Sequence, residues 1–65
     1  MSVEVKEKNR FIAGRIIRKI FNEHGQDYDD MRRGSWFYLE LPDYITSLVQ
    51  QGAIDDAENY LRELF

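Results

Sequence analysis

The apolar residues of the first third of the chain recur at the spacing of an amphipathic helix. They share one half of a helical wheel drawn at about 100° per residue. These residues are Val5, Ile12, Ala13, Ile16, Ile17, Ile20 and Phe21. The pattern predicts a long helix from about Val5 to His24. Gly25 follows where a glycine commonly ends a helix, because it adopts the left-handed conformation without penalty.

The next segment is polar and then turns strongly apolar and aromatic. Residues 26–34 predict a connection with at most one helical turn, ended by Gly34. Residues 35–41 are rich in side chains that favour strands, and Pro42 disfavours a helix through that point. We therefore predict a short strand over residues 35–41. Its backbone needs a pairing partner, either residues 2–6 or the same strand in a second copy.

The last third of the chain predicts a helical hairpin. Pro42 suits the first turn of a helix, and Gly52 suits its end. The sequence Asp55-Asp56-Ala57-Glu58 has the form of a capping box, which marks the start of a final helix. The expected fold class is therefore α+β and mainly α. It combines a long N-terminal amphipathic helix, one short strand and a C-terminal helical hairpin in a single small domain, residues 1–65.

Length and composition restrict the classes of function. A chain of 65 residues buries a small core and usually needs a further source of stability. Cysteine is absent and His24 is the one histidine, so we expect no disulfide, no metal site and no cofactor. No serine is tied to His24 by spacing, so we expect no enzymatic activity. Oligomerisation remains as the source of added stability, so we expect a homodimer or binding to another protein.

Hydropathy also bears on location. No apolar stretch is long enough to span a membrane, and the first residues lack the apolar core of a signal peptide. We therefore expect a cytoplasmic protein. The compact, cysteine-free form is typical of a small bacterial or phage protein.

The net charge of −3 conceals two halves of opposite sign. Residues 1–33 carry eight Lys and Arg against six Asp and Glu, which is +2, whereas residues 34–65 carry one Arg against six carboxylates, which is −5. The predicted first helix places a basic face opposite its apolar half: Lys8, Arg15, Arg18 and Lys19, with Phe11 among them. Such a face suits a nucleic acid with a base stacked on Phe11, an acidic protein, an anionic membrane surface or water alone.

A second candidate region is the predicted strand, with Arg32 and Arg33 just before it. The residues Phe37-Tyr38-Leu39-Glu40-Leu41-Pro42-Asp43, then Gly52, then Ala57-Glu58 and Leu61-Arg62-Glu63-Leu64 resemble the ribbon-helix-helix family of dimeric DNA-binding repressors and antitoxins. The resemblance implies that two strands pair across a two-fold axis and enter the DNA major groove.

Our leading interpretation is a small non-enzymatic regulatory or adaptor protein that acts by protein–protein binding. The candidate contact residues are Trp36, Tyr38, Tyr44 and Phe11, because aromatic side chains dominate binding hot spots. Trp36 and Tyr38 equally suit a core or a dimer seam. The alternative function is a dimeric, ribbon-helix-helix-like DNA-binding transcriptional regulator or antitoxin.

Overall fold

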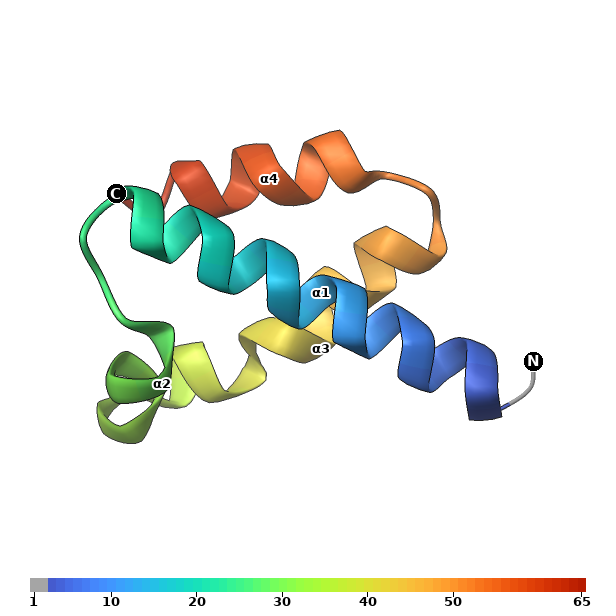
Figure 1. Cartoon of the computed structure of the whole chain (residues 1–65), viewed down its shortest axis with the longest axis horizontal. Coiled ribbons are helices and arrows are strands. Elements are labelled where there is room, and N and C mark those ends of the chain that lie inside the picture. Colours follow the sequence, from blue (N-terminus) through green and yellow to red (C-terminus); the bar gives the residue numbers. More distant parts are fainter. Residues whose placement is uncertain (1–2) are drawn as a thin grey trace.

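A computed structural model describes residues 3–65 of the chain and contains only helices in that range. The elements in order are α1 (Val3–Glu23), α2 (Tyr28–Met31), the 3-10 turn η1 (Arg32–Gly34), α3 (Trp36–Gln50) and α4 (Ile54–Arg62). α3 and α4 form a hairpin, and α1 packs across both of its helices (Figure 1). The C-terminus lies beside the last turn of α1 (Figure 1).

The long first helix is confirmed, and it begins slightly earlier than expected. Its end is a Schellman motif, in which the amide of Gln26 donates to the carbonyl of Phe21 at 2.9 Å and the amide of Gly25 donates to that of Asn22 at 3.0 Å. Gly25 has a φ of 73°, as the sequence predicts. The polar connection that follows contains one short helix and η1, so a turn of helix at that point is also confirmed.

The predicted strand over residues 35–41 is wrong, and the fold is all-α rather than α+β. Residues 36–41 form the first turns of α3. Tyr38, Leu41 and Ile45 are spaced to share one helical face, and that face packs into the core. Phe37 and Leu39, which would share one face with Leu41 in a strand, are exposed instead. Burial of the helical stripe therefore outweighs the local preference of these residues for strands.

The pairing partners expected for that strand are accordingly helical. Residues 3–6 belong to α1, and Ser2 lies outside the described residues. The residues expected to enter a DNA major groove as a strand are the first turns of α3. Residues 3–65 therefore contain no strand that could pair across a two-fold axis in the way the resemblance implies.

Pro42 lies inside α3, where it removes one backbone hydrogen bond. A proline has no N–H, so the carbonyl of Tyr38, four residues earlier, loses its usual helical donor. The hydroxyl of Tyr28 replaces that donor, at 2.5 Å from the Tyr38 oxygen. Burial raises the pKa of Tyr28, which keeps the hydroxyl protonated and able to donate. A side chain from α2 thus makes the proline tolerable in the helix.

The core is centred on Phe21, which has no exposed surface. Its ring meets the rings of Tyr28, Tyr38 and Phe65 edge to face, with centroids 5.4, 5.8 and 5.0 Å away. The largest other fully buried side chains are Ile17, Ile20, Ile45 and Leu61. One aromatic ring therefore joins α1, α2, α3 and the C-terminal residue.

The hairpin itself is confirmed, but its two helix starts differ from prediction. α3 begins at Trp36, so Pro42 is not its first residue. α4 begins at Ile54 with Ala53 at the N-cap position and no side-chain cap, so the expected capping box is not formed. Asp55 and Asp56 lie in the first turn instead, where carboxylates favour the positive end of the helix dipole.

His24 and Phe65 tie the end of the chain to α1. The His24 Nδ1–H donates to the carbonyl of Ile20 at 2.9 Å, so the imidazole caps the last turn of α1. The Phe65 ring stacks on the imidazole with a centroid distance of 4.3 Å and an interplanar angle of 5°. His24 therefore has a structural role at this helix end.

Candidate functional site

Two of the side chains that catalysis or metal binding could use, His24 and Asp27, have structural contacts in the fold. Within residues 3–65, no cluster of three or more His, Asp or Glu side chains is placed to hold a metal ion. Asp27 caps α2 by accepting from the amide of Asp29 at 3.0 Å. No helix in the described range is long and apolar enough to cross a bilayer. The features that remain without a structural explanation are two surfaces.

The first surface is an apolar patch at the start of α3, formed by Trp36, Phe37 and Leu39, here called the aromatic face. The exposed fractions of these side chains are 79%, 44% and 56%. They occupy neighbouring positions on one helix end, close to Arg33 and Glu40 in the sequence. On the helical wheel Trp36 lies between Leu39 and Phe37, and the Phe37 ring also meets the Tyr38 ring edge to face, with centroids 5.3 Å apart. Trp36 and Leu39 are the most exposed apolar side chains at this end of the helix, and exposed apolar side chains that lie close together mark a candidate interaction site.

The other two aromatic candidates from the sequence behave differently. Tyr38 turns inward, where its ring packs against Phe21, and it belongs to the core. Tyr44 is exposed, but its ring lies 4.7 Å from that of Tyr60 on α4 and helps to hold the hairpin together. Of the candidates on α3, Trp36 is therefore the one with no packing role in the fold.

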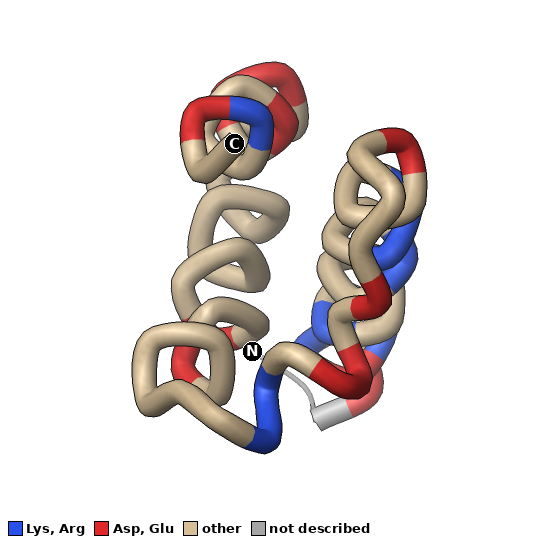
Figure 2. The backbone as a smooth tube through the Cα atoms, turned by 90° about the vertical axis from the view of Figure 1, so that its left-hand side faces the viewer, with Lys and Arg blue, Asp and Glu red and all other residues tan. Residues whose placement is uncertain are grey.

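The second surface is the outer side of α1, where Lys and Arg gather (Figure 2). Phe11 is 67% exposed, and the Arg15 guanidinium lies 6.0 Å from its ring centroid. Arg15, Lys8 and Arg33 have no carboxylate partner among the residues that the structure describes. The basic face predicted from the sequence is thus exposed, with Phe11 accessible on it.

Two members of this basic face are already paired with carboxylates of the same chain. Arg18 makes two hydrogen bonds to Asp29, at 3.1 and 3.3 Å, and these hold the pKa of that carboxyl below its usual value. Lys19 reaches Glu58 on α4 at 3.7 Å. Arg32 also lies 3.8 Å from Asp29. The charge available to an anionic partner is therefore smaller than the sequence suggests, and Lys8 and Arg15 carry most of it.

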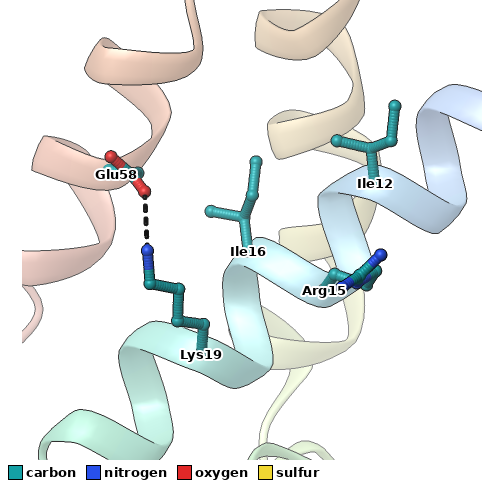
Figure 3. A pocket seen from close by; sticks show the side chains of 5 residues that line it. All are labelled: Ile12, Arg15, Ile16, Lys19 and Glu58. Atoms are coloured by element: carbon teal, nitrogen blue, oxygen red, sulfur yellow. Dashed lines mark ion pairs between the residues drawn. The ribbon is translucent and has the colours of Figure 1, made fainter.

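A groove between α1 and α4 borders the basic face. It has a volume of about 430 Å³ and is lined by Ile12, Arg15, Ile16, Lys19 and Glu58. Figure 3 shows Ile12 and Ile16 projecting from the same side of α1, with the Lys19–Glu58 ion pair bridging α1 and α4. The arrangement places an apolar floor next to cationic side chains.

Comparison with protein families, curated proteins and solved structures finds no match for this chain. The two surfaces therefore rest on their own geometry. Sequence reasoning did not select Phe37 and Leu39 because strand alternation places them on the face opposite to Trp36 and Tyr38. It missed the groove because Ile12 and Ile16 have the spacing of core residues. That spacing does not show which part of the apolar face of α1 is covered by α4.

Proposed function

We propose that this chain is a small, cytoplasmic, non-enzymatic regulatory or adaptor protein that acts by protein–protein binding, as a homodimer joined through the aromatic face. The observation that carries the proposal is the 79% exposure of Trp36 beside Phe37 and Leu39. Tryptophan is the residue type most enriched in binding hot spots. Burying one large apolar side chain contributes about 1.5–3 kcal/mol, so covering this patch is strongly favourable.

The charges that flank the aromatic face favour a second copy as its occupant. Arg33 precedes the face, Glu40 follows Leu39, and neither has an ion-pair partner in the described part of the chain. A two-fold axis brings the same patch of both copies together in antiparallel orientation. In that orientation the end of the aromatic face that follows η1 and its Arg33 in one copy meets the end that carries Glu40 in the other. The patch is therefore self-complementary in charge as well as apolar.

Chain length supports the same conclusion. Domains of this size bury a small fraction of their surface, and oligomerisation is a common source of added stability where disulfides and metals are absent. A homodimer also doubles every remaining surface, which suits a protein that works by binding. Two copies of the basic face would then bind a multivalent partner with increased avidity.

A charge-swap experiment tests the dimer and its orientation. Arg33→Glu and Glu40→Arg are each expected to weaken dimerisation by about tenfold or more, because each places like charges together across the axis. The double variant Arg33→Glu/Glu40→Arg restores the pairs and should recover the wild-type dissociation constant. Sedimentation equilibrium measures all four proteins. Arg62→Glu, with the same change in charge on α4, is the matched control.

Two results would contradict the proposal. A wild-type chain that sediments as a monomer at millimolar concentration excludes the homodimer. A double variant that remains as weak as its parents excludes the antiparallel arrangement of the aromatic face.

A further inference from the structure

We infer that the groove between α1 and α4 binds an acidic amphipathic helix of a partner protein. The inference rests on the proposed mode of action, which is protein–protein binding, and it assigns the partner's chemistry. It concerns a surface separate from the aromatic face. None of the residues that line the groove belongs to the start of α3.

The floor of the groove has the spacing that a helix recognises. Ile12 and Ile16 are four residues apart, one turn of α1, and both are half-buried at the edge of the core. Helices dock into apolar grooves through side chains at positions i, i+3, i+4 and i+7. Two apolar side chains of a partner helix, one turn apart, therefore match this floor.

The rim of the groove defines the partner's charge. Lys8, Arg15 and Lys19 lie along one stripe of α1, which spans about 16 Å at 1.5 Å per residue. Lys8 and Arg15 have no carboxylate partner in the described residues, and Lys19 pairs with Glu58, whose side chain is only 22% exposed. Carboxylates along one edge of a docked helix would face this stripe, and an apolar residue beside them would contact the exposed ring of Phe11.

The same residues disfavour the other anionic partners. Arg18, which belongs to the basic face but not to this stripe, is held by Asp29, so the basic face lacks the dense positive charge that a nucleic-acid backbone requires. Glu58 lines the groove, and Asp55 and Asp56 begin the same helix, so a polyanion or an anionic membrane meets carboxylates beside the cations. A peptide that carries its acidic residues on one edge avoids that repulsion.

A binding titration with a synthetic peptide tests the inference. The probe is a fluorescent peptide of about 15 residues, the length at which an isolated helix begins to be stable. It consists of Ala, Glu and Leu, with two Leu four residues apart and Glu along one edge. Fluorescence anisotropy should show binding to the full chain that weakens as salt is raised. Arg15→Glu should weaken the affinity by about tenfold, whereas Arg33→Glu, with the same charge change outside the groove, should leave it within about twofold.

Methyl spectra locate the bound peptide. Addition of the peptide should shift the methyl resonances of Ile12 and Ile16 and leave the Trp36 indole signal unchanged. The same titration with Trp36→Ala separates this inference from the homodimer. If the Trp36→Ala variant no longer dimerises but binds the peptide with unchanged affinity, the groove assignment stands without the homodimer. If the wild-type chain dimerises but does not bind the peptide, only the groove assignment is wrong.

Three outcomes overturn the inference. The first is no binding of the acidic peptide at low salt. The second is equal affinity for the Arg15→Glu and wild-type proteins. The third is tighter binding of a Lys-for-Glu version of the peptide, a DNA duplex or vesicles of anionic phospholipid.

Discussion

Phe21→Ala is expected to lower the free energy of unfolding by about 3–5 kcal/mol, the usual cost of truncating a fully buried aromatic side chain. Phe21 has no exposed surface, and its ring contacts three other rings drawn from α2, α3 and the C-terminal residue. Removing it leaves a cavity where those elements meet. Small domains have a total stability of only about 5–15 kcal/mol, so this loss removes a large part of it and lowers the thermal midpoint of the variant.

Phe37→Ala is the matched control, since it removes the same side chain from an exposed position of α3. Its expected cost is less than about 1 kcal/mol when measured at dilute, monomeric concentration. Urea unfolding followed by circular dichroism at 222 nm, a standard helix signal, compares the two variants. Equal costs for Phe21→Ala and Phe37→Ala would show that the core is not centred on Phe21.

The second large effect concerns the hydrogen bond from Tyr28 to the carbonyl of Tyr38. Tyr28→Phe keeps the buried ring and removes only the hydroxyl, so the carbonyl freed by Pro42 loses its donor. An unsatisfied buried acceptor costs about 1–3 kcal/mol, and that is the expected loss of stability.

A double-mutant cycle with Pro42→Ala tests the reason for that loss. Alanine restores a backbone N–H at position 42, which can donate to the Tyr38 carbonyl as in a regular helix. In the Pro42→Ala background, Tyr28→Phe is therefore expected to cost about 1 kcal/mol or less. The two changes should couple by about 0.5–2 kcal/mol. Identical costs of Tyr28→Phe in both backgrounds would contradict the role assigned to its hydroxyl.

The local sequence pattern was sufficient to predict α1 as a helix but not α3, because the interaction that permits a helix in α3 comes from a distant residue. In α1, apolar periodicity and Gly25 agree with each other, and the observed helix follows both. In α3, aromatic residues and Pro42 both oppose a helix locally. The hydroxyl that offsets the proline comes from Tyr28, ten residues before Tyr38, so no window around Pro42 contains the deciding interaction.

The sequence identified the aromatic residue types that form the candidate surfaces. It identified only in part which of those residues are exposed. Trp36 and Phe11 were identified as contact candidates and both are exposed, whereas Tyr38 has the same chemistry and lies in the core. The groove depends on relative helix length. α1 has 21 residues and α4 has 9, so α4 is less than half as long as α1. The apolar pattern of α1 does not show which of its residues α4 covers.

The fluorescence of Trp36 tests the central claim most directly, because Trp36 is the one tryptophan of the chain. If two copies join through the aromatic face, raising the concentration from about 1 µM to about 1 mM should shift the emission to shorter wavelength and protect the indole from acrylamide. Leu39→Lys, which places a charge in the same face, should keep the indole accessible throughout. Emission typical of a solvent-exposed indole at every wild-type concentration would contradict the claim.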